Sequence, residues 1–203
     1  MRAPAARVGG VEILPPRVMT DWLTGQVSGA EVVVSERRIG DLAGVFADAE
    51  AFARLPADRV VYRTECILGV PPGTVGGLFW GTTFIEPGTV GDEYFMTKGH
   101  IHAKPDRMEA YFTFCGAGLL LLMDAERHCR AERMTPGSTH LIPAFTAHRT
   151  VNIGEDVFSF GACWPSDAGH AYQAIADAGF AARVVRSQGA PRVVPNESTV
   201  CRH

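Results

Sequence analysis

The sequence predicts an all-β protein, a barrel or a sandwich with a few short helices. From residue 60 onward, short runs rich in β-branched and aromatic residues alternate with turn sequences that contain Gly or Pro. These turn sequences include PPG at 71–73, EPG at 86–88, CGAG at 115–118 and TPG at 135–137. Many short strands at this spacing are typical of a closed or two-layered sheet. The expected strands cover residues 60–70, 77–85, 93–97, 108–115, 119–123, 127–134, 139–142, 149–153 and 157–164.

The length of the chain, 203 residues, suits one sizeable hydrophobic core and is short for two domains. We therefore expect a single domain with an N-terminal arm at 1–36, a barrel core at 60–165, and a C-terminal helix and tail at 166–203. The arm is rich in Pro, Gly and Val, and we expect one or two strands in it, one of them near 30–35.

Two helices are expected outside the strand-rich region. The first covers residues 41–55 and ends at Pro56, because a proline cannot continue a helix. Its apolar positions recur at helical spacing, and they are Leu42, Val45, Phe46, Ala49 and Phe52. The second helix is short, covers about 171–178 and stops at Gly179.

Composition narrows the class of protein. The chain has 19 Lys and Arg against 22 Asp and Glu, a net charge of −3, which gives no reason to expect binding to nucleic acid or to an anionic membrane. No apolar run approaches the roughly 20 residues that span a bilayer, and the first residues lack the apolar core of a secretory signal, so we expect the cytoplasm. The five cysteines are scattered, with no CxxC pair, which argues against a disulfide framework or a thiolate zinc site.

One segment carries the residues with the clearest chemistry. His100 and His102 are two residues apart, which in a strand would place both imidazoles on the same face. Glu109 lies seven residues further on, after a turn indicated by Pro105 and Asp106. A hairpin of this kind can bring the two imidazoles and the carboxylate together.

A fourth candidate, His148, lies in a later run that can return across the same barrel interior. Three imidazoles and one carboxylate suit a divalent Fe, Mn, Co, Ni or Zn ion, and an octahedral ion would keep two positions open for substrate or water. A single buried His is usually a structural residue with its hydrogen bonds satisfied, but the four positions together favour a metal site. The remaining histidines without a pattern, His128, His140 and His203, are expected at the surface.

The motifs around these residues resemble those of a known family. GHIHAKPDRME at 99–109, GAG at 116–118, PG at 136–137 and IPAFTAH at 142–148 resemble the two cupin motifs, which implies a double-stranded β-helix, a jelly-roll barrel. Longer segments are similar to the archaeal-type (cupin) glucose-6-phosphate isomerase family. These segments are GTTFIEPGTVGDEYF at 81–95, TKGHIHAKPDRMEAY at 97–111, AHRTVNIGED at 147–156 and PSDAGHAYQAIADAGF at 165–180.

This resemblance implies a metal-dependent aldose–ketose isomerase that interconverts glucose 6-phosphate and fructose 6-phosphate, as in glycolysis and gluconeogenesis. The family's ligands for one divalent ion per subunit match His100, His102, Glu109 and His148, with Fe²⁺ favoured over Mn²⁺, Ni²⁺, Co²⁺ or Zn²⁺. Positions that line the sugar-phosphate site match Thr83, Thr97 and Gly99, and further polar positions around the substrate match Tyr111, His170 and Tyr172.

The phosphate end of such a site can be described in physical terms. Threonine hydroxyls and the backbone N–H groups near Gly99 can bind phosphate oxygens. Lys98 or Arg149 would supply positive charge, unless both are plain surface residues. Trp164 stands where the family usually has Tyr, so the chain keeps an aromatic wall there and loses a hydroxyl.

The isomerisation moves a proton between C1 and C2 of the sugar, or shifts a hydride directly. For the proton route, Glu109 would serve as the base if it swings off the metal, with Tyr172 or His170 assisting ring opening. A bound metal ion would polarise the carbonyl and hydroxyl oxygens of the substrate.

Two other functions stay open at this point. One is another cupin enzyme, either an isomerase of a different phosphosugar or a metal-dependent dioxygenase, and the other is a non-catalytic sugar-binding cupin. The resemblance also implies a homodimer, in which the Val-rich arm either exchanges strands with a second copy or folds back on its own barrel.

Overall fold

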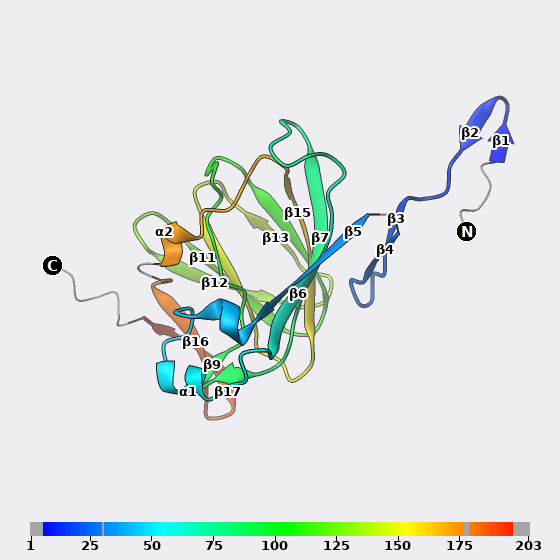
Figure 1. The fold of residues 1–203 in the computed structure, drawn as a ribbon. Helices are drawn as coiled ribbons and strands as arrows, with labels where there is room; N and C mark the ends of the chain where they lie inside the picture. The colour runs from blue at the N-terminus through cyan, green and yellow to red at the C-terminus, as the bar shows by residue number, and fades with distance from the viewer. Residues whose placement is uncertain (1–5, 30, 177–178, 197–203) are drawn as a thin grey trace.

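The computed structural model describes residues 6–29, 31–176 and 179–196. Strands dominate it (Figure 1), and buried apolar side chains of the described residues form a large hydrophobic cluster. One sheet has the order β13 (Thr139–Ile142), β10 (Glu109–Cys115), β15 (Phe158–Pro165), β7 (Leu78–Ile85), β6 (Val60–Ile67) and β5 (Val32–Arg38). The facing sheet has the order β12 (Cys129–Met134), β11 (Gly118–Met123) and β14 (Ala147–Asn152).

A further extended segment completes the facing sheet. Met96 and His100 form antiparallel bridges with Val151 and His148, so residues 96–100 lie along the free edge of β14. In chain order from β7 to β15, these two sheets contain eight segments, and consecutive segments lie in opposite sheets except for β11 and β12. One sheet has β7, β15, β10 and β13 as neighbours, which are the first, eighth, third and sixth segments. The other has residues 96–100, β14, β11 and β12 as neighbours, which are the second, seventh, fourth and fifth. This order is that of a jelly roll, and the expected all-β barrel is confirmed.

The interior of the barrel is filled by apolar side chains from both sheets. β11 is buried over its whole length, and Leu120 and Leu122, each at most 1% exposed, face the interior on the same side as His148, which pairs with Leu122. Phe158 and Phe160 of β15 stack on each other from the opposite sheet, with ring centroids 5.6 Å apart. Phe160 also lines a cavity at the end of the barrel where polar side chains gather.

The helix expected over 41–55 is wrong. The structure has a 3₁₀-helix, η1 (Ile39–Leu42), and a separate five-residue α1 (Ala49–Ala53). Gly44 has a φ of +77°, a left-handed conformation that ends a helix. The Asp48 carboxylate then accepts a hydrogen bond from the Ala51 backbone N–H, which starts α1 anew.

The C-terminal region contains more than the expected helix and tail. The short helix α2 (Gln173–Ala176) is followed by a hairpin of β16 (Ala182–Ser187) and β17 (Ala190–Pro195). This hairpin joins β8 (Thr89–Val90) and β9 (Glu93–Tyr94) in a four-stranded sheet on the outside of the barrel. Among the described residues, neither α-helix has the length and apolar character needed to cross a bilayer.

The N-terminal arm contains two hairpins. β1 (Ala6–Val8) pairs with β2 (Val11–Ile13), and this hairpin projects away from the barrel (Figure 1). β3 (Val18–Thr20) pairs with β4 (Val27–Gly29), and the backbone N–H of Val27 donates to the buried carboxylate of Glu65 on β6 at 2.8 Å. The second hairpin is thereby fixed to the barrel, while the first is free of it.

Candidate active site

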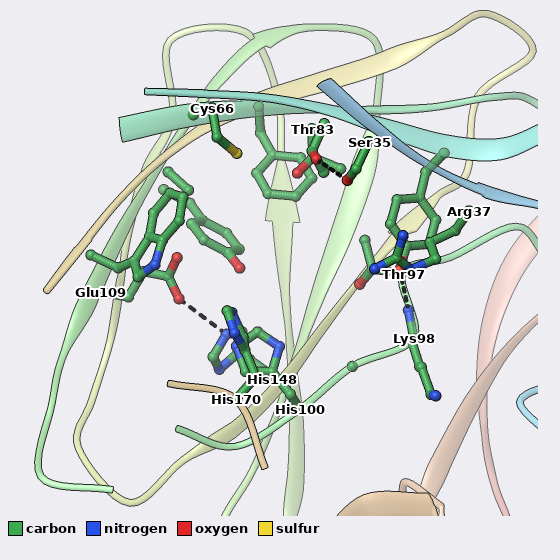
Figure 2. Close-up of a pocket in the computed structure, with 18 of the residues that line it drawn as sticks. Ser35, Arg37, Cys66, Thr83, Thr97, Lys98, His100, Glu109, His148 and His170 are labelled. Carbon is green, nitrogen blue, oxygen red and sulfur yellow. Dashed lines mark hydrogen bonds and ion pairs between the residues drawn. The ribbon is translucent and has the colours of Figure 1, made fainter. Parts of the chain in front are cut away.

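A cavity of about 370 Å³ opens between the two sheets, at the end of the barrel where polar side chains gather. Figure 2 shows His100, His148 and Glu109 on one side of this cavity and Arg37, Thr97 and Lys98 on another. The cavity therefore has an imidazole and carboxylate end and a cationic, hydroxyl-bearing end.

Four side chains converge at the first of these ends. One nitrogen or oxygen atom from each of His100, His102, Glu109 and His148 lies within 4.8 Å of all the others. Glu109 begins β10 and His148 lies on β14, and the backbones of His100 and His148 exchange hydrogen bonds of 3.1 and 2.9 Å. The histidine pair was expected in a strand, but only His100 forms a bridge and His102 follows outside any strand.

Backbone carbonyl groups orient two of these rings. The Nδ1 atom of His102 lies 2.9 Å from the carbonyl oxygen of Arg107, and Nδ1 of His148 lies 3.3 Å from that of Thr146. When each Nδ1–H donates to its carbonyl, each Nε2 has a lone pair directed at the cluster. Glu109 Oε2 lies 3.2 Å from His102 Nε2 and 3.1 Å from His148 Nε2.

A carboxylate facing two nitrogen lone pairs is unfavourable unless a proton or a cation lies between them. Within the described residues, Nε2 of His100 and Nε2 of His148 have no hydrogen-bond partner, since the approach of Glu109 to His148 is close without hydrogen-bond geometry. Buried polar atoms without partners are costly. The donor set, its burial and these free nitrogens all fit a divalent metal ion.

Protonation within the cluster follows from burial and contact. Burial alone would raise the pKa of Glu109, but its hydrogen bond with His102 and its close approach to the His148 imidazole outweigh burial and hold the pKa low. Burial alone would lower the pKa of His102, but its hydrogen bonds to Glu109 and to the Arg107 carbonyl raise it. Burial and the three neighbouring imidazoles hold the pKa of His100 well below its ordinary value, so this ring is neutral and ready to act as a ligand.

The substrate residues expected from the sequence all line this cavity. They are Thr83, Thr97, Lys98, Gly99, Tyr111, Trp164, His170 and Tyr172. Glu109 and Tyr111 share the inner face of β10, as the alternation of a strand requires. Trp164 packs edge-on against Phe79, with ring centroids 5.7 Å apart, so the aromatic wall is retained.

Two aromatic rings lie next to the histidine cluster. The rings of His170 and Tyr172 are stacked, with centroids 5.5 Å apart and an interplanar angle of 11°. The His170 ring is also 4.4 Å from the ring of His100, although part of its surface remains exposed. Desolvation of the covered part lowers the pKa of His170, which keeps this ring neutral at pH 7.

Several lining residues were not expected from the sequence. Ser35 and Arg37 come from β5, and Tyr62, Thr64 and Cys66 come from β6. The Ser35 and Thr64 hydroxyls are 2.8 Å apart across this strand pair. The signal that could have found these residues is their spacing of two within each strand, which places them on one face.

The surface position expected for His140 is wrong. This side chain is 6% exposed, with Nδ1 2.8 Å from a Glu132 oxygen and Nε2 2.9 Å from the Ser138 hydroxyl. It is a structural histidine with both nitrogens satisfied. His128 is exposed, as expected, and His203 lies outside the described residues.

The expectation of unpaired cysteines agrees with the structure for the described residues, since Cys66, Cys115, Cys129 and Cys163 are all free thiols. Burial raises the pKa of Cys66, the one of these four that lines the cavity, so its thiol is protonated at neutral pH.

The jelly-roll topology, together with the three imidazoles and one carboxylate inside it, defines a protein of the cupin class. The family model described as "Glucose-6-phosphate isomerase (GPI)" matches residues 36–201. The chain therefore belongs to the glucose-6-phosphate isomerase family.

Curated relatives support this assignment along nearly the whole chain. A glucose-6-phosphate isomerase of Thermococcus onnurineus is 42% identical over 183 residues, which cover 90% of this chain and 95% of the relative. The one from Pyrococcus furiosus is 41% identical over 184 residues, with 90% and 95% covered. A bacterial relative of the same name, from Sinorhizobium medicae, is 39% identical over 168 residues, with 81% and 77% covered.

Solved structures resemble the chain more distantly. Oxalate decarboxylase from Bacillus subtilis is 18% identical with a TM-score of 0.43, over 54% of this chain and 26% of that one. An oxalate oxidase in complex with the substrate analogue glycolate is 14% identical with a TM-score of 0.42, over 70% and 54%. The assignment of the fold rests on the strand order rather than on these likenesses.

Proposed function

We propose that this protein interconverts glucose 6-phosphate and fructose 6-phosphate, with a divalent metal ion held by His100, His102, Glu109 and His148. The observation that carries the proposal is the pairing, in one cavity, of this ligand set with a cationic, hydroxyl-lined end that suits a phosphate group. The names of the family and of its curated relatives support it.

The four ligands would hold an ion with positions left open toward the cavity. When bound, such an ion polarises the carbonyl and the neighbouring hydroxyl of the open-chain sugar and stabilises the developing negative charge. Among the candidate metals we propose Fe²⁺ as the native one, with Mn²⁺, Ni²⁺, Co²⁺ and Zn²⁺ as alternatives that the same ligand set accepts.

The phosphate group would lie at the opposite end of the cavity. Figure 2 shows Arg37, Thr97 and Lys98 close together there, with Thr83 and Ser35 along the adjoining wall. Two cations and several hydroxyls provide charge-assisted hydrogen bonds for a dianion. A phosphate bound there would turn the other end of the sugar toward the histidines, which supports a phosphosugar isomerase over a dioxygenase.

Proton transfer between C1 and C2 requires a base near the histidine cluster. Glu109 is one candidate, because its carboxylate is ionised and points into the cavity. His170 is the other, because its neutral ring can accept a proton and Tyr172 stacks on it. Ring opening of the cyclic sugar would use the same neutral imidazole and the Tyr172 hydroxyl.

A coupled assay in both directions tests the proposal. Metal-loaded protein should convert fructose 6-phosphate to glucose 6-phosphate and back, chelator should abolish the conversion, and added Fe²⁺ should restore it. Conversion of a different phosphosugar alone would indicate another isomerase of the same class. Tight sugar-phosphate binding without turnover of any substrate would indicate a binding protein.

We further propose a cytoplasmic homodimer that acts in glycolysis and gluconeogenesis. The arm supports the dimer, because it exposes a series of apolar side chains that a second copy could cover. These are Val11, Ile13, Leu14, Met19, Trp22 and Leu23, each more than half exposed. Measuring the molar mass in solution, with and without residues 1–16, tests the role of the first hairpin.

A further inference from the structure

Arg149 is a buried guanidinium that the proposed mechanism does not use. It follows His148 on β14, and strand alternation turns its side chain away from the histidine cluster. The residue is 6% exposed, and within residues 6–29, 31–176 and 179–196 no carboxylate lies within ion-pair distance of it. A cation buried without an ion pair is costly, so its remaining contacts need an explanation.

The facing segment has an irregular register at this point. The Thr97 backbone N–H donates to the Thr150 carbonyl at 2.9 Å, and His100 exchanges two backbone hydrogen bonds with His148. Between these paired positions β14 has one residue, Arg149, whereas the facing segment has two. This is a β-bulge, and bulges often occur next to active sites, where they re-aim side chains.

The guanidinium of Arg149 occupies the gap that the bulge leaves. Its Nη2 atom donates to the carbonyl oxygen of Lys98 at 2.7 Å, a group that lies between the backbone pairs. The central carbon of the guanidinium, Cζ, lies over the ring of Phe180, 4.7 Å from its centroid. The side chain of Arg149 thus supplies a hydrogen bond where the bulge interrupts the pairing of the strands.

Gly99 is packed tightly on the same groups. Its φ of +75° is left-handed, and an added Cβ would lie 2.7 Å from a Phe180 ring carbon and 3.0 Å from Arg149 Nε. Arg149 and Phe180 therefore press directly against the backbone that is expected to bind the phosphate oxygens. The position of this backbone depends on them.

We propose that Arg149 is a positioning residue, which holds the bulge at Lys98 and Gly99 so that the phosphate-binding backbone lies at a fixed distance from the metal ligand His100. This inference deepens the proposed function and rests on it. Part of the predicted phosphate cradle, Thr97–Gly99, and the metal ligand His100 follow one another on one short segment, and the bulge sets the spacing between them.

Arg149→Met tests the proposal, with Arg149→Lys as the conservative variant and Arg183→Met as the matched control. Arg183 is also a partly buried arginine with an unpartnered Nε, but it belongs to β16. Two quantities are measured: KM and kcat for fructose 6-phosphate on protein of known metal content, and the Kd for fructose 6-phosphate of the metal-free protein by calorimetry.

Arg149→Met should raise KM and Kd about ten- to a hundredfold, the range expected when a hydrogen bond from a charged donor is lost. The kcat per bound metal should change by less than about threefold, because the reacting carbons lie at the other end of the cavity. Arg149→Lys should recover part of the affinity, since an ammonium group can still donate to the Lys98 carbonyl. Arg183→Met should resemble the wild type.

If Arg149 has a merely structural role, Arg149→Met will have a lower midpoint of thermal unfolding, while KM and Kd of the folded protein stay within about twofold of wild type. This result would overturn the proposal. If Arg149→Met does not fold, Arg149→Gln, whose side chain is too short to reach the carbonyl, takes its place with the same expectation. If the wild type does not interconvert the two sugars, the proposed function fails separately, and calorimetry with fructose 6-phosphate and inorganic phosphate still decides the role of Arg149.

Discussion

A carboxylate oxygen of Glu109 lies 3.2 Å from Nε2 of His102 at the centre of the cluster. The other ring nitrogen lies 2.9 Å from the Arg107 carbonyl, so a neutral His102 would direct a lone pair at the carboxylate. The pair is stable only with a positive charge between its two members. In the metal-free protein this charge is a proton, and in the loaded protein it is the ion.

This relationship predicts how metal affinity depends on pH. Contact with Glu109 and the Arg107 carbonyl, acting against burial, raises the pKa of His102 above its ordinary 6.5. A metal ion displaces that proton, so its apparent affinity should fall as the pH drops below the raised pKa, by about tenfold per pH unit. Titration with Co²⁺, followed by visible absorption at several pH values, measures this. An affinity that does not change with pH would contradict the assignment of His102 as a ligand.

Asp167 supports the same histidine from further away. Its buried carboxylate accepts hydrogen bonds from Nε and Nη2 of Arg107, at 3.1 and 2.9 Å, and Arg107 in turn offers its carbonyl to His102. Asp167→Asn keeps the shape of the side chain and removes its charge. We expect metal affinity to fall about tenfold to a hundredfold, the usual effect of losing support behind a metal ligand.

The control for this variant is Asp106→Asn. Asp106 also pairs with Arg107, through Nη1 at 2.7 Å, but it is exposed and does not approach the histidines. Its metal affinity should equal that of wild type when both are measured by competition with a chromophoric chelator. An unchanged metal affinity in Asp167→Asn would show that the contact between Asp167 and Arg107 does not influence His102.

The cationic end of the cavity gives a prediction about substrate binding. Arg37→Gln should raise the KM for fructose 6-phosphate about three- to tenfold and weaken its dependence on salt, because a charge that faces the phosphate is lost. Arg38→Gln is the control, since strand alternation turns its side chain away and it pairs with Glu36 at the surface. Steady-state kinetics at two ionic strengths separate the two variants, and an unchanged KM for Arg37→Gln would place the phosphate elsewhere.

The barrel strands and the histidine cluster were predictable because their signals are local. Alternation along residues 109–115 indicates which side chains of β10 face inward, and the short turns rich in Gly and Pro separate the strands. The helix over 41–55 failed although its apolar spacing is helical, because Gly44 and the capping side chain of Asp48 divide the segment. The local backbone conformation and capping thus prevented one continuous helix, although the spacing of the apolar residues favours it.

Other features depend on contacts between distant parts of the chain. In the sequence, Arg37 is the middle of three consecutive charged residues, ERR, with nothing to distinguish it from its neighbours. Only the pairing of β5 with β6 places its side chain in the cavity. The hairpin of β16 and β17 has an apolar alternation too short to distinguish from a tail without the strand β9 that it joins. In both cases the missing information is the partner strand, which the sequence does not identify.

The last prediction concerns the proton that moves during isomerisation. Partial burial lowers the pKa of His170 below its ordinary 6.5, so the ring is neutral above that pH and becomes protonated only in more acidic solution. If His170 is the base, kcat/KM should fall with decreasing pH through a midpoint below about 6.5. His170→Asn should remove this acid limb and lower kcat about a hundredfold to ten-thousandfold, the contribution typical of a general base.

The same reaction in deuterated water distinguishes the two routes between C1 and C2. Proton transfer through His170 should place deuterium on the transferred position, because this side chain is exposed and a proton held on its ring exchanges with solvent. The product of the wild type, analysed by NMR, should therefore contain deuterium at C1 or C2. Product without deuterium, together with an acid limb that persists in His170→Asn, would exclude His170 as the base and favour a direct hydride shift between the two carbons.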